Sequence, residues 1–186
     1  MNRLEFKAVT IVASILLLGI CVVSAKAQNA RLDLSNLDKL ASKAKETADI
    51  ALDEKMLPSA LGFLKDGDSE QAQIKELVSK LKGVYVKVFE FEKPGAYDDS
   101  DIEPIRSQLQ SAGWTKIAGV QSKEETVGVH VKYHEDAVMG LAILVAEPNE
   151  LVIVNIVGPV DLDKLIQLAG KFGSLDLKKL GVQVNP

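Results

Sequence analysis

The fold is decided by two nearly unbroken apolar runs, Val138-Met-Gly-Leu-Ala-Ile-Leu-Val-Ala146 and Leu151-Val-Ile-Val-Asn-Ile-Val157. Only Glu147-Pro148-Asn149-Glu150 separates them, and these residue types favour a tight turn. Short apolar runs bounded by turn residues are typical of buried strands, and a tight turn joins strands in antiparallel fashion. We therefore expect an antiparallel pair at the centre of a sheet, with helices over at least one face.

Three further segments, 84–91, 114–121 and 126–134, carry apolar residues in the alternation of a strand. The segment 126–134 contains both histidines of the chain, at positions 130 and 134. In it we expect Val127, Val129, Val131 and Tyr133 to face inward, and Gly128, His130, Lys132 and His134 to form a polar stripe with two solvated histidines.

Helical patterns lie between and before these strands. Ser100 and Glu103 have the spacing of a capping box that opens a helix, and Asp161 is placed to cap a last helix that ends near Phe172. Residues 31–82 are mainly helical in pattern, beginning with Ser35 as a cap. Residues 48–52 fit either a helix or a short strand, and we favour the strand.

These patterns predict an α+β fold, with a mainly antiparallel sheet of about five strands and helices packed on it. We expect an N-terminal mainly helical segment over 28–82, the α+β core of the same domain over 83–173, and a C-terminal tail over 174–186.

The first 27 residues have the three parts of a secretory signal. Arg3 and Lys7 precede an apolar run from Ala8 to Val23, and Ala25-Lys26-Ala27 places small residues where a signal peptidase reads them. The run is shorter than the roughly 20 residues of a membrane-spanning helix, which disfavours the alternative of a retained anchor. We predict cleavage after Ala27 and a periplasmic or secreted protein.

Cys21 is the only cysteine, and it precedes the predicted cleavage site. A lipoprotein signal needs a small residue just before the cysteine, whereas Ile20 is large, so lipidation at Cys21 is disfavoured. Removal of the signal leaves 159 residues without a disulfide and with a formal charge of −6. An acidic chain without a long basic run is a poor candidate for binding nucleic acid.

No catalytic or metal-binding motif emerges from the spacing of the polar residues. His130 and His134 would lie roughly 13 Å apart on a strand, too far to share a zinc ion. The acids at 66–70 and 99–103 lack the glycine and glutamate that a calcium loop requires, and no Gly-x-Ser-x-Gly elbow is present. We predict no catalytic residues, no metal site and no cofactor.

Asn155 is the one polar residue inside the second apolar run, and a buried amide must be hydrogen-bonded. The alternatives are a structural partner for its amide or a ligand.

The segment 83–172 carries a recognisable order of motifs: Gly-Val-Tyr-Val-Lys-Val-Phe-Glu-Phe at 83–91, Gly113-Trp114, Ala146-Glu147-Pro148, and Asn155-Ile-Val-Gly-Pro-Val-Asp-Leu162. This order resembles an exported bacterial family known as domain of unknown function 4252. The resemblance implies a cell-envelope protein without established enzyme chemistry, loosely associated with genes for extracytoplasmic sigma factors and their regulators. It marks Asn155, Gly158 and Pro159 as a motif of unknown role.

We therefore expect an exported non-enzymatic binding or interaction module with an envelope protein as its partner, linked to envelope signalling. The alternatives are a hydrolase whose carboxylates converge only in the fold and a purely structural envelope protein. A cleft with two buried acids, or His130 within hydrogen-bond reach of an acid, would favour the hydrolase.

Overall fold

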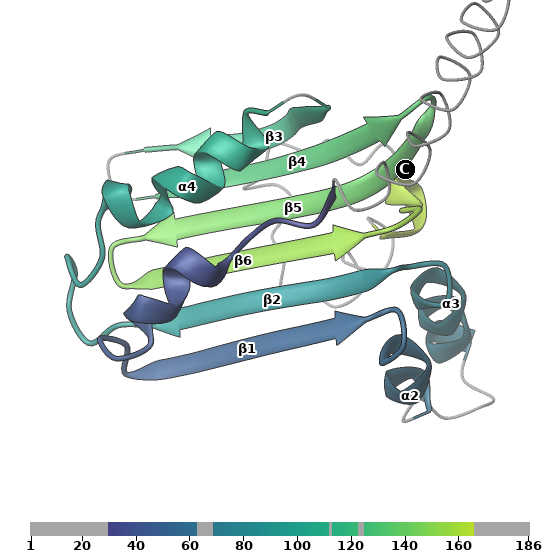
Figure 1. The fold of residues 1–186 in the computed structure, drawn as a ribbon, viewed down its shortest axis with the longest axis horizontal. Coiled ribbons are helices and arrows are strands. Elements are labelled where there is room, and N and C mark those ends of the chain that lie inside the picture. Colours follow the sequence, from purple (N-terminus) through teal and green to yellow (C-terminus); the bar gives the residue numbers. More distant parts are fainter. Residues whose placement is uncertain (1–29, 63–68, 112, 123–124, 166–186) are drawn as a thin grey trace, which may run out of the picture.

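A six-stranded antiparallel sheet forms the centre of the protein (Figure 1). The computed structural model describes residues 30–62, 69–111, 113–122 and 125–165. The strand order in space is β1-β2-β6-β5-β4-β3. In chain order the strands are β1 (Glu46–Asp53), β2 (Gly83–Glu90), β3 (Trp114–Gln121), β4 (Thr126–His134), β5 (Ala137–Glu147) and β6 (Glu150–Val157).

The two apolar runs form the predicted antiparallel pair. β5 and β6 are joined by the tight turn between Glu147 and Glu150, and β6 also pairs with β2, so both runs lie in the interior of the sheet. The favoured strand at 48–52 is confirmed as part of β1, which pairs with β2 along its whole length. The expectation of about five strands was therefore one too low, since β1 adds an edge strand from within the 28–82 segment.

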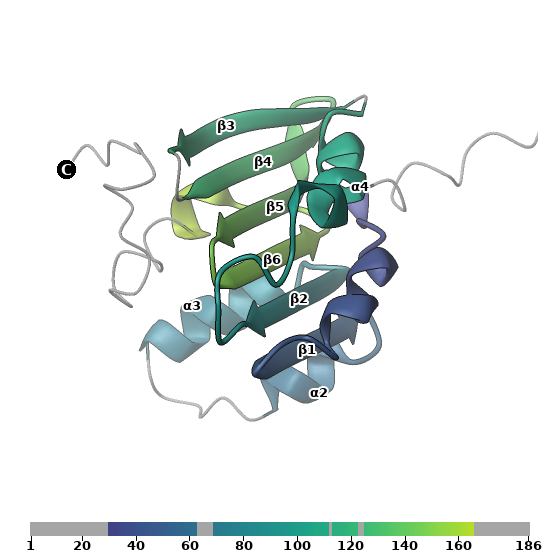
Figure 2. The same cartoon turned by 90° about the vertical axis from the view of Figure 1, so that its left-hand side faces the viewer.

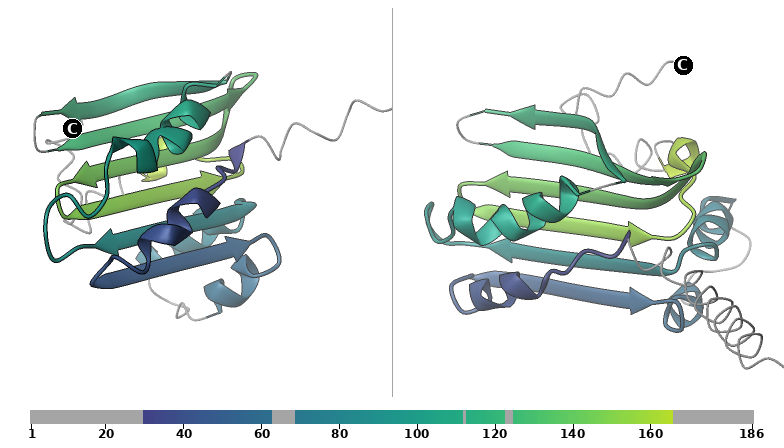
Figure 3. Two further views of the ribbon diagram at one scale, coloured as in Figure 1. Left: turned by 60° about the vertical axis from the view of Figure 1, so that its left-hand side comes forward. Right: turned by 45° about the horizontal axis from the view of Figure 1, so that its top comes forward.

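One face of the sheet, here called the front face, is covered by two short helices. These are η2 (Ser35–Leu40), a 3₁₀ helix, and α4 (Asp99–Leu109), which lie side by side in Figures 2 and 3. The main core lies between them and the sheet, and its largest buried side chains are Leu37, Leu40, Phe91, Ile102, Ile105, Leu151 and Ile153. Helices α2 (Leu57–Leu61) and α3 (Ser69–Val78) lie at the end of β1 and β2 (Figure 1).

The opposite, back face of the sheet is rich in valine. Val127, Val129, Val131 and Leu141 form a second buried cluster there, with Leu162 and Leu165 packed against it. The side chain of Asp161 accepts a hydrogen bond from the backbone N–H of Lys164 at 3.1 Å, as expected of the cap of the last helix. The predicted continuation of that helix to Phe172, the tail at 174–186 and the signal at 1–27 lie outside the described residues.

Two predicted helix starts were wrong in detail. The capping box of α4 is made by Asp98 and Asp101 rather than by Ser100 and Glu103. Asp98 has extended backbone and accepts from the N–H of Ser100, so the helix begins earlier than the Ser-x-x-Glu spacing indicated. Ser35 caps no α-helix, because its own N–H binds the Asp33 carboxylate and the chain continues as the 3₁₀ turn η2.

The polar stripe predicted on β4 is also corrected. Gly128 and Lys132 are buried and His130 is half-buried, because the His130 ring lies over Gly128 and the Lys132 side chain packs beside Gly113 and the Trp114 ring. Tyr133 was expected to point inward but is 45% exposed, since a register shift between Lys132 and Tyr133 interrupts the pairing of β4 with β5. Among the described residues, no helix is both long and apolar enough to cross a bilayer.

Candidate functional site

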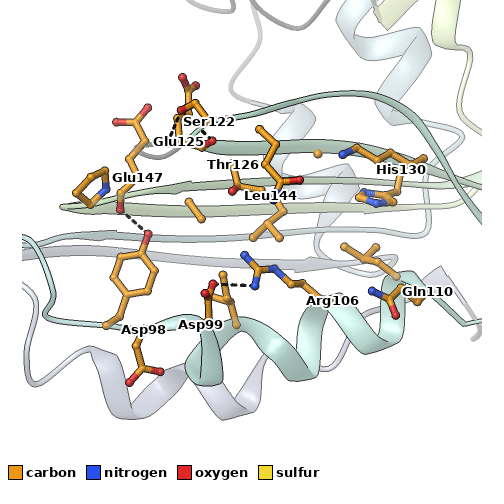
Figure 4. Close-up of a pocket in the computed structure, with 18 of the residues that line it drawn as sticks. Asp98, Asp99, Arg106, Gln110, Ser122, Glu125, Thr126, His130, Leu144 and Glu147 are labelled. Atoms are coloured by element: carbon orange, nitrogen blue, oxygen red, sulfur yellow. Dashed lines mark hydrogen bonds and ion pairs between the residues drawn. The ribbon is translucent and has the colours of Figure 1, made fainter.

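A groove of about 850 Å³ lies between α4 and the front face of β3, β4 and β5. We call it the α4 groove. It is open to solvent along its length, and Figure 4 shows its lining side chains. Helix α4 and its two caps contribute Asp98, Asp99, Arg106 and Gln110. The strands contribute Lys116, Thr126, His130, Leu144 and Glu147, and Glu125 comes from the residue just before β4.

Two glycines opposite each other on β3 and β4 leave room for neighbouring side chains to lie close to the sheet at the α4 groove. Gly119 pairs directly with Gly128 in the sheet. A Cβ on Gly128 would lie 2.8 Å from Cε1 of His130, and one on Gly119 would lie 2.4 Å from Cε of Lys116. The absence of both Cβ atoms therefore lets the imidazole of His130 and the side chain of Lys116 lie against the sheet.

His130 is the most unusual polar group in the groove. Its Nδ1 atom is buried and has no hydrogen-bond partner among the described residues. Burial lowers the pKa of His130 below its usual value of 6.5, and the positive charge of Lys116 lowers it further. His130 is therefore a neutral imidazole at pH 7, whereas His134 is exposed at the end of β4 and does not line the groove.

The charged side chains divide the α4 groove into two ends. Glu125, Glu147 and Asp98 lie toward one end, and His130 and Gln110 lie at the other, as Figure 4 shows. Lys116 pairs with His130 across β3 and β4, and its side chain lies over Gly119, which pairs with Gly128 between the two ends. Between the ends, Arg106 Nη1 binds Asp99 Oδ1 at 2.8 Å beside the apolar floor at Leu144.

The acidic end is fixed by Tyr97. Its hydroxyl donates to the backbone carbonyl oxygens of Glu147 and, at 3.1 Å, Glu150. These bonds tie the segment before α4 to the β5–β6 turn. Burial, together with the nearby charge of Glu147, raises the pKa of Tyr97 to about 12, so that its hydroxyl remains a donor at neutral pH.

The carboxylates that line the groove are exposed or half-buried. Asp98 and Asp99 are exposed, and they serve respectively as the cap of α4 and as the partner of Arg106. Glu125 and Glu147 are only half-buried. The two observations that would favour a hydrolase, two buried acids or an acid bonded to His130, are both missing from the described part of the groove. Within the described residues, no three His, Cys, Asp or Glu side chains gather as metal ligands.

Asn155 lies outside the α4 groove and is fully buried in β6. Its Oδ1 accepts from the N–H of Leu32 at 2.9 Å, and its Nδ2 donates to the carbonyls of Ala30 at 2.9 Å and Leu141 at 3.3 Å. Residues 30–34, which we call the N-terminal strap, are thereby held on the front face of the sheet. Of the two alternatives predicted for this amide, its contacts match the structural one, in which it binds other parts of the chain.

Gly158 and Pro159 contact a different region from Asn155. Gly158 has φ of +117°, and a Cβ there would lie 2.7 Å from the backbone nitrogen of Lys82. Only glycine fits this close approach between the end of β6 and the segment before β2. Pro159 is exposed. The three residues of the motif therefore do not converge on one site.

The α4 groove was not predicted from the sequence. Arg106, Lys116 and Glu125 are ordinary surface residues by sequence, and the opposition of Gly119 and Gly128 depends on the strand register. The sequence signal that could have indicated the groove is the pair of glycines within two neighbouring strand patterns, because a glycine inside a strand often marks a close approach of other atoms to the backbone.

Comparison with known proteins gives one match. The model of a family described as a domain of unknown function, DUF4252, matches residues 41–168, which include every strand of the sheet. No curated protein and no solved structure matches the chain. Because the match covers more than half of the chain, and confirms the resemblance in the motifs between 83 and 172, the protein belongs to the DUF4252 family.

Proposed function

We propose that this protein is an exported, non-enzymatic binding module of the bacterial cell envelope, and that its α4 groove holds an extended segment of a partner protein. The observation that supports this most is that the carboxylates of Glu125 and Glu147 gather at one end of the groove, while Lys116 and His130 lie farther along it, beside the apolar side chain of Leu144. Electrostatic complementarity of this kind sets the direction in which a ligand lies.

The dimensions of the groove suit a short peptide. Thr126 and His130 line it from one strand, so the two ends are separated by about four strand residues, or roughly 13 Å. A peptide of about four extended residues spans this distance. Its basic side chain would face Glu125 and Glu147, and its acidic side chain would face Lys116. Gln110 and Thr126 offer polar groups for its backbone.

His130 is suited to contact the acidic side chain of such a ligand. Its imidazole is neutral at pH 7 and its Nδ1 has no partner among the described residues. An acidic side chain placed beside Lys116 would bring a carboxylate near the ring, which favours protonation of His130. Binding is therefore expected to raise the pKa of His130.

The export of the protein is part of this proposal and depends on the signal at 1–27. In a periplasmic or secreted protein the groove would meet envelope proteins, and a partner in envelope signalling fits what the resemblance implies. A purely structural envelope protein is less well supported, since it gives no reason for a groove with separated charges.

Site-specific crosslinking in living cells tests the proposal. A photoreactive amino acid at Gln110, which is exposed and lines the groove, is expected to form a covalent adduct with a partner protein. The yield of the adduct is expected to fall when the two charges are reversed together, by Lys116→Glu with Glu147→Lys.

The matched control carries the same photoreactive residue at Ser107. This position is exposed on the same helix but does not line the groove. An adduct that forms equally from both positions, or that is insensitive to the charge reversals, would contradict binding in the groove.

A further inference from the structure

The two edges of the sheet are built differently. β3 at one edge carries Lys116 and a register shift between Lys116 and Ala118, both of which discourage the pairing of another strand. β1 at the other edge pairs with β2 over eight consecutive residues without a shift. It contains no lysine and no proline, and all of its residues except Leu52 are exposed. β1 is thus the edge that offers its outer backbone groups to another strand.

The two faces of β1 differ in chemistry. Ala48, Ile50 and Leu52 lie on the back face, where they pair with Val88, Val86 and Val84 of β2. Ile50 is 45% exposed, so the valine-rich back face reaches the edge uncovered at this point. The front face of β1 instead presents Thr47, Asp49, Ala51 and Asp53. A strand added beside β1 would meet apolar side chains on one face and carboxylates on the other.

A second groove, of about 540 Å³, lies on the front side of β1. We call it the β1 groove; the N-terminal strap lines one side of it, and Asp49, Ala51 and Lys87 line another. Lys87 Nζ binds both Asp38 Oδ1 at 2.7 Å and Asp49 Oδ2 at 2.6 Å. Two carboxylates thus share one ammonium group, which leaves a negative charge for a further cation.

A third carboxylate adds to this charge. Asp33 also lines the β1 groove, and hydrogen bonds from Ser35 lower the pKa of its carboxyl below the usual 3.8. The guanidinium of Arg31 lies over the ring of Tyr85 on β2, 4.3 Å from its centroid. The lining charges of Arg31, Asp33, Asp38, Asp49 and Lys87 together leave one negative charge in excess.

We propose that β1 is a docking edge for an extended segment of a partner protein whose side chains alternate between apolar and basic. Its apolar side chains would continue the back face beside Ile50, and its basic side chains would enter the β1 groove near Asp38 and Asp49. Backbone hydrogen bonds to an edge strand supply affinity, and the side chains of alternate residues supply specificity. This surface is separate from the α4 groove.

A second copy of this chain fits the edge less well. Antiparallel pairing of two β1 strands about Asp49 sets like charges opposite each other, which destabilises a strand pair. Pairing about Ile50 leaves Glu46 of one copy opposite Glu54 of the other. The mature chain is also acidic overall, with a formal charge of −6. A basic partner satisfies the same edge without this repulsion.

Titration with synthetic peptides tests the proposal on the whole mature chain. The probe is a capped octapeptide that alternates valine and lysine, compared with a valine–glutamate octapeptide and with four valines followed by four lysines. Only the alternating valine–lysine peptide is expected to bind, with backbone amide shift changes in 46–53. Ile50→Lys is expected to weaken its affinity about tenfold or more, because lysine is the residue that protects natural edges.

Ile117→Lys is the matched control, since Ile117 is 46% exposed on the opposite edge of the sheet. It is expected to bind the peptide like the unchanged chain, and Asp49→Asn is expected to bind it more weakly. Equal binding of the valine–glutamate peptide, shift changes confined to β3 or the α4 groove, or self-association through β1 without peptide binding would each overturn the proposal. Because the photoreactive residue at Gln110 lies in the other groove, the two proposals fail independently.

Discussion

At the residue scale, the side chain of Asn155 provides hydrogen bonds to backbone groups that a neighbouring strand would otherwise bind. The N-terminal strap meets the sheet without belonging to it, so its backbone groups need partners other than a ladder. The amide of Asn155 provides them by accepting from Leu32 and donating to Ala30. Gln108 of α4 does the same for Asp33, whose N–H and carbonyl it binds at 2.7 and 2.9 Å. Two side-chain amides thus hold the strap from opposite sides.

Asn155→Leu tests this clamp. The leucine keeps the volume but leaves the buried N–H of Leu32 and the buried carbonyl of Ala30 without partners. Each unsatisfied buried group costs about 1–3 kcal/mol, so the free energy of unfolding is expected to fall by about 3 kcal/mol. Urea denaturation of the mature chain measures it. Gln108→Leu is the control, since its bonds to Asp33 are exposed and water replaces them, and it should cost less than about 1 kcal/mol. Equal losses would contradict the clamp.

The stability of the folded chain is expected to depend on pH through His130. Burial and the charge of Lys116 lower its pKa, so the folded chain holds the neutral form more firmly than the unfolded chain does. The stability that depends on His130 is therefore present above pH 6.5 and is lost as the pH falls through the lowered pKa.

Lys116→Gln removes the smaller of the two causes. The pKa of His130 is expected to rise but to stay below 6.5, since burial remains. NMR titration of the imidazole nitrogens measures the pKa directly. His134 is the internal control, because it is exposed and does not line the α4 groove. A fall in the pKa of His130, or no change, would show that Lys116 does not face the ring.

At the element scale, the pairing of β3 with β4 depends on its two opposed glycines. The substitutions Gly119→Ala and Gly128→Ala are expected to differ in effect, because the two glycines have different neighbours. A Cβ on Gly119 would lie 2.5 Å from the backbone carbonyl oxygen of Val127, which is fixed in the sheet. A Cβ on Gly128 would meet only the ring of His130, which can rotate away.

Gly119→Ala is therefore expected to cost about 1–3 kcal/mol of unfolding free energy, and Gly128→Ala less than about 1 kcal/mol. Gly128→Ala should instead displace His130 into the α4 groove and change the shifts of its imidazole. Thermal or urea unfolding and NMR measure the two effects. The reverse order of stability would mean that β3 and β4 are not held in this register.

The secondary-structure elements differ in how well the sequence predicts them. Strands β2 to β6 follow from alternation and from the tight turn at 147–150, because these signals are local. β1 was less clear, since Ala48, Ile50 and Leu52 fit a helix almost as well, and only its pairing with β2 decides between them. The start of α4 was misplaced because Asp98 and Ser100 are both good caps, and in the structure Asp98 is the one whose side chain accepts the backbone N–H groups.

The α4 groove could not be predicted, because it depends on contacts between distant segments. His130 lines the groove together with residues of α4, and its neighbour Lys116 comes from another strand. The contacts of Asn155 were foreseen only as a need for some partner, since nothing local to β6 indicates Ala30 and Leu32, 125 and 123 residues away.

At the scale of the whole molecule, the predicted cleavage site is close in sequence to the N-terminal strap of the folded domain. Ala30 and Leu32 are buried and held by Asn155, and the predicted cleavage site after Ala27 leaves only Gln28 and Asn29 before them. A signal peptidase needs its cleavage region accessible and extended, so we expect processing to precede docking of the strap.

Intact mass and N-terminal sequencing of the exported protein are expected to give Gln28 as the first residue. Ala27→Leu should block processing, since the position before the cut requires a small residue, and the precursor should collect in the membrane fraction. Cys21→Ser is the control and should be processed like the unchanged chain. A mature protein that began at Cys21, with processing abolished by Cys21→Ser, would instead establish a lipid anchor, and the nine residues from Cys21 to Asn29 would then link the membrane to the strap.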